Sequence, residues 1–118
     1  MKRGELFDYV IDAVEYSSGL RNIKEKTRQR EYVDARRIAY HILRIIHGLP
    51  LQVIAKEFNK NHASVIYAIK DVDFLIKTDP FFKETYDRTM KQLSMGNFRK
   101  EQILKEIKEL QEEFLTIN

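Results

Sequence analysis

Apolar residues recur every three or four positions through most of this 118-residue chain, and few helix-breaking residues interrupt them. The sequence contains only four glycines and two prolines. Long segments with this spacing are typical of amphipathic helices, which bury one face and expose the other. The pattern predicts an all-α protein, and the length fits one domain with a modest core.

Glycine, proline and asparagine mark the expected ends of the helices. Before residue 79, helices are expected over residues 4–16, 31–47, 50–58 and 62–77. A further helix is expected to be capped by Asp79 and to begin at Pro80. The basic stretch 22–30 has no apolar period and is interpreted as a loop. A tight turn is expected from Asn59 to Asn61, because asparagine tolerates left-handed backbone.

The same spacing predicts which side chains form the core. In the second expected helix the inward positions are Ala35, Ile38, Ala39, Ile42, Ile45 and Ile46. In the last expected helix the apolar seam consists of Phe82, Tyr86, Met90 and Leu93. We also interpret Phe81 as a core residue, in preference to a surface on which bases stack.

Positive charge is concentrated in the middle third of the chain. Residues 21–60 contain ten Lys and Arg against four Asp and Glu, a local net charge of +6, whereas the whole chain carries +3. A concentrated basic patch indicates a polyanionic partner. A solvated basic surface has the same composition, so charge alone does not decide between the two.

Several other classes of function lack their characteristic residues. There is no cysteine, and His41 and His47 are six residues apart, which does not suit a shared metal ion. Ser17 and Ser18 have no base placed beside them, and no glycine-rich phosphate loop occurs. No apolar run approaches the roughly 18 residues of a membrane span. We therefore expect a cytoplasmic protein that is not an enzyme and takes no cofactor, metal, nucleotide or membrane partner.

Residues 50–77 fit the geometry of a helix-turn-helix. Two helices that cross steeply need a small residue at their contact, and Ala55 supplies it. Ile54 and Phe58 flank this contact as core residues, and Val65 packs back from the second helix. A generic helical hairpin shares several of these positions, so the fit is moderately specific.

The stretch "KNHAS" (60–64) opens the second of these helices. The start of a helix favours phosphate through its free N–H groups and its dipole, and short polar side chains there reach base edges in the major groove. The predicted contacts are Asn61 and His62 with bases, Ala63 with a thymine methyl group, Ser64 with base or phosphate, and Lys60 and Lys70 with phosphate.

The run of residues 30–76, "REYVDARRIAYHILRIIHGLPLQVIAKEFNKNHASVIYAIKDVDFLI", resembles the C-terminal DNA-binding domain of the bacterial replication initiator DnaA. The resemblance covers about residues 5–94. Its most specific parts are the helix "REYVDARRIAYHILR", the segment "IAKEF", and "NHASV" against the family's "DHTTV" signature. It implies an all-α helix-turn-helix domain of the DnaA C-terminal or Trp-repressor-like type that binds double-stranded DNA.

The resemblance also implies a second DNA contact. A basic loop (24–30) would enter the minor groove beside the major groove that the recognition helix (about 62–77) occupies, with Arg28 as its principal base reader. Arg36 and Arg44 match positions expected to contact DNA, Arg44 at a phosphate. The full set of expected DNA-binding residues is Lys26, Arg28, Arg30, Arg36, Arg37, Arg44, Lys60, Asn61, His62, Ala63, Ser64, Tyr67 and Lys70.

Two features of this set concern the side chains themselves. Lys26, Arg28 and Arg30 alternate with other residues, so extended backbone would direct all three cations to one side. Alternatively, Arg30 pairs with Asp34 one turn into the next helix. Three positions depart from the family's signature, where Lys60 replaces an arginine, Asn61 an aspartate and Ala63 a threonine.

The family's full initiator carries an ATP-hydrolysing AAA+ domain, for which this sequence has no phosphate loop. We therefore expect a stand-alone binding module that acts as a replication or transcription accessory factor. The alternative is a helical interaction or scaffold protein that keeps the fold without significant DNA affinity.

Residues 96–118 are expected to form an amphipathic helix after a DNA-binding domain that spans residues 1–95. Apolar residues follow heptad spacing at Ile103, Ile107, Leu110, Phe114 and Ile117. This seam would either fold back onto the domain or pair with its copy in a homodimer.

Overall fold

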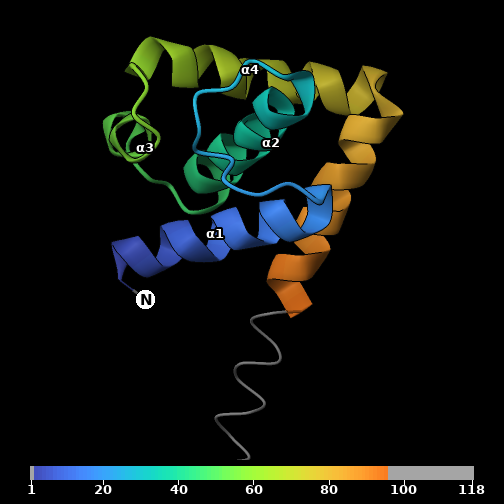
Figure 1. Cartoon of the computed structure of the whole chain (residues 1–118), viewed down its shortest axis with the longest axis horizontal. Helices are drawn as coiled ribbons and strands as arrows, with labels where there is room; N and C mark the ends of the chain where they lie inside the picture. The colour runs from blue at the N-terminus through green and yellow to red at the C-terminus, as the bar shows by residue number, and fades with distance from the viewer. Residues whose placement is uncertain (1, 96–118) are drawn as a thin grey trace, which may run out of the picture.

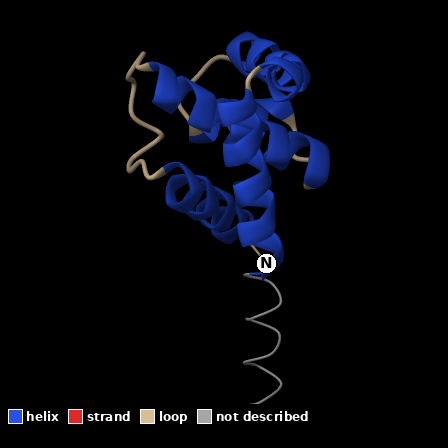
Figure 2. Cartoon of the chain, turned by 90° about the vertical axis from the view of Figure 1, so that its right-hand side faces the viewer, coloured by secondary structure: helices blue, strands red, loops and turns tan. Residues whose placement is uncertain are grey.

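The computed structural model describes residues 2–95, which form helices joined by short connections (Figures 1 and 2). In order, the elements are α1 (Arg3–Ser18), α2 (Arg30–His41), η1 (Ile42–Ile46), α3 (Leu51–Glu57) and α4 (His62–Thr78), followed by a helix over residues 80–95. No strand occurs in this part of the chain, and the all-α prediction is confirmed. The predicted helix over 96–118 and its heptad positions lie outside the described residues.

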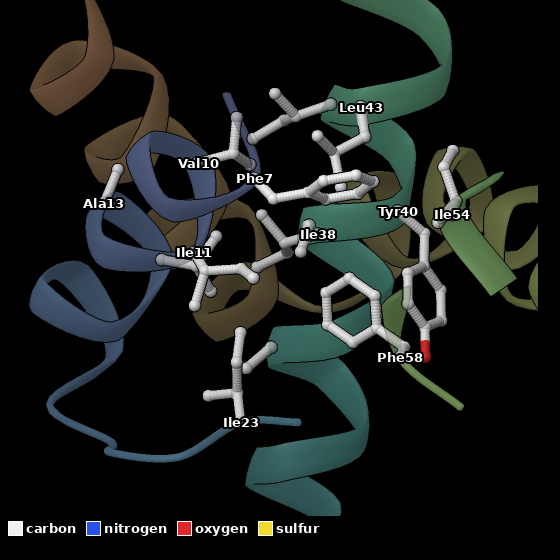
Figure 3. Packing of buried hydrophobic residues seen from close by; sticks show 14 of the residues in the cluster. Phe7, Val10, Ile11, Ala13, Ile23, Ile38, Tyr40, Leu43, Ile54 and Phe58 are labelled. Atoms are coloured by element: carbon white, nitrogen blue, oxygen red, sulfur yellow. The ribbon is translucent and has the colours of Figure 1, made fainter. Parts of the chain in front are cut away.

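Helix α2 lies at the centre of the molecule and contacts both α1 and α4 (Figure 1). Apolar side chains from α1, α2 and the loop between them meet in the main core (Figure 3). Its fully buried members include Val10, Val14, Ile23, Ile38, Ile42, Leu43, Ile54, Phe58, Val65 and Val72. Burial of each large aliphatic or aromatic side chain stabilises the fold by about 1.5–3 kcal/mol.

The helix over residues 80–95 packs against α1 with the predicted seam. Phe82 and Leu93 are buried, and the hydroxyl of Tyr9 in α1 donates a hydrogen bond to the Leu93 carbonyl. Asp79 caps this helix as expected, since its side-chain oxygen accepts from the N–H groups of Phe81 and Phe82 at 3.1 Å. The prediction of a core position for Phe81 is wrong, because Phe81 is 75% exposed. Adjacent helix residues point about 100° apart, and Phe82 takes the inward position.

The second predicted helix ends in a π turn, η1. The His47 N–H donates to the Ile42 carbonyl at 3.3 Å, a five-residue spacing. The wider turn changes the register of the apolar face, and the chain leaves the helix at Gly48, which has φ +66°. Ile45 and Ile46 are therefore 61% and 48% exposed, and their predicted core positions are corrected.

The predicted helix-turn-helix is present as α3, a tight turn and α4. Asn59 adopts left-handed backbone with φ +52°, and the Lys60 N–H donates to the Ala55 carbonyl at 2.8 Å. Ala55, Phe58 and Val65 are buried at the contact. The edge of the Phe58 ring meets the Tyr40 ring of α2, with centroids 4.8 Å apart. This packing fixes α4 on α2 and leaves the first turn of α4 at the surface.

Candidate nucleic-acid interface

An asparagine cap builds the exposed start of α4. Asn61 has extended backbone, and its side-chain oxygen accepts a hydrogen bond from the Ser64 N–H at 2.8 Å. The cap satisfies one of the free N–H groups of the first turn. The side chains of His62, Ala63 and Ser64 are exposed beside it. The sequence predicts a base contact for Asn61; because its side-chain oxygen accepts the cap bond, the amide NH₂ group is the donor that such a contact would use.

Lys60 lies on the same side of the molecule as the second half of the loop. Arg36 donates to the Glu25 and Thr27 carbonyls on either side of Lys26, and it lines one depression with Lys60. Burial lowers the pKa of Lys60 from its ordinary value, and the positive charges of Arg36, Lys26 and Arg28 lower it further. We call Lys26, Arg28 and Lys60 the basic cluster.

Arg36 is buried, which the sequence did not predict. Only 6% of the residue is exposed. Its guanidinium donates to three carbonyls of the loop, those of Ile23 at 3.2 Å, Glu25 at 2.8 Å and Thr27 at 2.6 Å. The sequence predicts a direct DNA contact for Arg36, whereas the structure shows the loop folded over this side chain and bonded to it.

Arg30 and Arg37 are neutralised by carboxylates. The Arg30 Nε donates to Asp34 at 3.0 Å, and this bond and the Asp34 charge raise the pKa of Arg30. A second carboxylate, Asp79, lies 3.7 Å from its Nη2. Arg37 bridges Asp34 at 2.9 Å and Asp71 of α4 at 3.3 Å. The alternative pairing of Arg30 with Asp34 is therefore the one observed, and the loop presents two cations together instead of three.

A shallow depression runs between α2 and the first turns of α4. Arg36, Lys60, Ser64 and Tyr67 are among the residues that line it. Tyr67 is 66% exposed, and the Lys70 Nζ lies 5.9 Å from the centroid of its ring. Both predicted side chains thus stand on the exposed face of α4, about two turns beyond the cap.

Arg44 lies on η1, apart from the depression. Its side chain is exposed and donates one hydrogen bond to the Leu49 carbonyl at 3.0 Å. The guanidinium has five N–H donors, so most of them remain directed at solvent. This leaves Arg44 able to contact a phosphate, as predicted, while it braces the connection to α3.

Sequence patterns alone barely indicate the residues that hold the loop. Ile23 is fully buried, and its N–H donates to the Glu15 carboxylate of α1 at 3.1 Å. Lys24 forms an ion pair with Glu57 of α3. The one signal was Ile23 itself, a large aliphatic residue inside an otherwise polar stretch.

Comparisons with known proteins agree with this geometry. Residues 7–72 match the family described as "Bacterial dnaA protein helix-turn-helix". The chain is 33% identical over 98 residues to "Chromosomal replication initiator protein DnaA" of Flavobacterium psychrophilum, an alignment that covers 80% of this chain and 20% of that protein. The protein of the same name from Thermodesulfovibrio yellowstonii is 33% identical over 76 residues, covering 64% and 17%.

The chain thus spans about a fifth of the length of these curated relatives. No solved structure matches it significantly. Within residues 2–95, no helix is long and apolar enough to cross a membrane. The family match covers more than half of the chain and includes the helix-turn-helix seen in the fold. The chain therefore belongs to the bacterial DnaA helix-turn-helix family.

Proposed function

We propose that this chain binds double-stranded DNA sequence-selectively, as an accessory factor in replication or transcription. The start of α4 enters the major groove, and the loop over residues 24–30 lies in the adjacent minor groove. Lys26, Arg28 and Lys60 contact the backbone or the minor-groove floor, and His62, Ala63 and Ser64 face base edges.

One observation carries this proposal. Arg36 holds the loop and also lines the same depression as Lys60 and Ser64. The side chain that holds the loop therefore borders the same depression as the start of α4, so the two elements that would enter neighbouring grooves lie on one surface. This surface is rich in cations, and DNA carries one negative charge per about 1.7 Å of helix axis.

The chemistry of the first turn of α4 supports reading of bases. Its exposed side chains are short, so the helix axis can approach the groove closely. His62 offers ring nitrogens to a base edge, and Ala63 offers a methyl group that fits against thymine. The capped helix start adds free N–H groups and a positive dipole end for a nearby phosphate.

A binding selection followed by a salt titration tests the proposal. The full chain is used to select duplexes from a random library, and fluorescence anisotropy then compares the selected duplex with a scrambled one between about 50 and 200 mM salt. We expect tighter binding to the selected duplex and a log–log slope of roughly −3 or steeper, about −0.9 for each phosphate contact. Weak binding without a slope would instead support the interaction-protein alternative.

A pair of charge-matched variants locates the surface. Lys70→Ala removes a cation from the exposed face of α4, and Lys91→Ala removes an exposed cation from the helix over residues 80–95. Lys70→Ala should make the slope shallower by about 0.9 and Lys91→Ala should leave it unchanged. Equal changes in both variants would mean that DNA binds elsewhere or without a defined orientation.

A further inference from the structure

The loop between α1 and α2 has two halves that are held differently. Its first half is fixed by the buried Ile23 side chain, by the bond from the Ile23 N–H to Glu15, and by the pair of Lys24 with Glu57. These contacts reach α1 and α3. They end before Lys26 and Arg28, the two loop members of the basic cluster.

The second half of the loop is tied to the domain by Arg36. The carbonyls of Glu25 and Thr27, on either side of Lys26, both accept from its guanidinium, at 2.8 Å and 2.6 Å. The other bonds of this stretch are local, namely Glu25 N–H to the Asn22 carbonyl, Thr27 N–H to the Glu25 carbonyl and Gln29 N–H to the Thr27 hydroxyl. Local bonds shape the loop but do not attach it to a helix.

Arg36 is suited to this attachment by its chemistry. A buried charge needs hydrogen-bonded partners, and three backbone carbonyls supply them where no carboxylate within residues 2–95 pairs with this guanidinium. The planar fork presents two Nη groups that reach carbonyls at alternate positions at once. A lysine in its place has one ammonium group on a flexible stem.

We propose that Arg36 is a positioning residue that fixes Lys26 and Arg28 beside Lys60 before DNA arrives, and that it does not contact DNA itself. The effect of Arg36 on DNA affinity rests on the proposed function. A loop that is already ordered loses less conformational entropy on association, so affinity rises through preorganisation. Arg36 thereby contributes to the minor-groove contact through Arg28.

A double-mutant cycle tests the coupling. Arg36→Lys keeps the charge and loses the fork, and Arg28→Ala removes the side chain that the fork is proposed to position. Each should weaken binding to the selected duplex by about tenfold, a value within the range for one base-reading arginine. The double variant should be no more than about twofold weaker than either one, because both remove the same contact. Losses that multiply, or wild-type binding by Arg36→Lys, would overturn the proposal.

Arg44→Ala is the matched control for this cycle. Arg44 is an exposed arginine on η1 outside the loop. Combined with Arg28→Ala, its loss should multiply, since the two side chains act independently. If the losses of Arg44→Ala and Arg28→Ala also fail to multiply, the Arg36 cycle does not report a specific coupling, and the result counts against the proposal.

The state of the loop in the free protein separates this inference from the proposed function. Backbone NMR order parameters of residues 25–28 should fall below about 0.6 in Arg36→Lys, while those of α1 stay near 0.85 as a check of the fold. Unchanged order in residues 25–28 overturns the positioning role whether or not DNA binds. A fall in order with no DNA binding by the wild-type protein supports the loop attachment and overturns the proposed function.

The wild-type protein provides a test that needs no folded variant. The Nη–H signals of Arg36 should keep their chemical shifts when the selected duplex is added, because their carbonyl partners stay the same. A phosphate contact would replace those partners and move the signals. Large shifts at Arg36 would therefore overturn the proposal even if Arg36→Lys fails to fold.

Discussion

Positive charges in two regions of this molecule have different neighbours. In the basic cluster, the charges of Lys26 and Arg28 lower the pKa of Lys60, and no ion pair within residues 2–95 engages these three side chains. On the helix over residues 80–95, two of the cations pair with carboxylates, Lys83 with Asp87 at 2.8 Å and Arg88 with Glu84 at 3.1 Å.

The two regions differ in what their charges do to the stability of the folded chain. Pairs one helical turn apart add a few tenths of a kcal/mol to a helix. Cations placed together without a carboxylate repel each other and lower the stability of the folded chain. Under the proposed function, bound DNA would remove that repulsion, and the basic cluster would be the region in which stability is given up for binding.

The substitution Arg28→Ala in the basic cluster should have the largest effect, which is a loss of DNA affinity. Narrow minor grooves in A·T tracts have enhanced negative potential and accept an inserted arginine. Arg28→Ala should lose roughly 1–3 kcal/mol of affinity on a duplex with an A·T tract about half a turn from the major-groove contacts. Anisotropy titrations on that duplex and on one with the tract changed to G·C measure the difference.

The comparison of the two duplexes decides how Arg28 works. On the G·C duplex, wild type and Arg28→Ala should bind nearly alike. If the variant loses the same affinity on both, Arg28 contacts phosphate only. Arg44→Ala is the reference for such behaviour, because a phosphate contact should weaken both duplexes equally and reduce the salt slope by about one.

Much of this arrangement follows from short-range sequence patterns. The expected helices, the turn at Asn59 and the cap at Asp79 depend on residues within a few positions of each other, and the structure contains them. The buried contact of Ala55, Phe58 and Val65 was also predicted, because the register of two adjacent helices fixes it.

The parts that were not predicted depend on distant residues. Arg36 looks like any exposed helix cation until the loop folds over it, and its carbonyl partners have no side-chain signature in the sequence. The Arg37–Asp71 pair joins residues on two helices. Phe81 and Phe82 are chemically identical neighbours, and only tertiary packing decides which of them is buried.

Lys60→Gln should reduce the charge repulsion in the basic cluster and so raise the stability of the folded chain slightly. Removal of one of several like charges should raise the free energy of unfolding by up to about 0.5 kcal/mol, with a larger gain at low salt. The same variant should bind DNA more weakly, with a salt slope shallower by about 0.9. Urea unfolding at two salt concentrations and anisotropy measure the two effects.

The control for this change is Lys91→Gln, on the helix over residues 80–95. It removes the same charge from an exposed position outside the basic cluster. Its stability should match the wild type at both salt concentrations. A loss of stability in Lys60→Gln, or an equal gain in Lys91→Gln, would contradict the view that repulsion within the basic cluster lowers stability.

The smallest expected effect belongs to His41, where α2 meets α4 and the helix over residues 80–95. Its Nδ1 lies 2.8 Å from the Tyr86 hydroxyl, and its Nε2 lies 4.0 Å from an Asp73 oxygen. Burial lowers the pKa of His41 below its ordinary value of 6.5, and the Asp73 charge partly opposes this. The folded chain therefore takes up this proton at lower pH than the unfolded chain does.

The sign of the pH effect follows from that difference. Below about pH 6.5 the unfolded chain binds more protons at this residue, so the contribution of His41 to stability is fully present above that pH and is lost as the pH falls toward the folded pKa. His41→Asn keeps a polar group near the Tyr86 hydroxyl and does not titrate, so its free energy of unfolding should fall less between about pH 7.5 and 5.5. His47→Asn, at an exposed position, is the matched control. Urea unfolding at both pH values measures all three chains, and equal losses in wild type and His41→Asn would show that this junction does not respond to pH through His41.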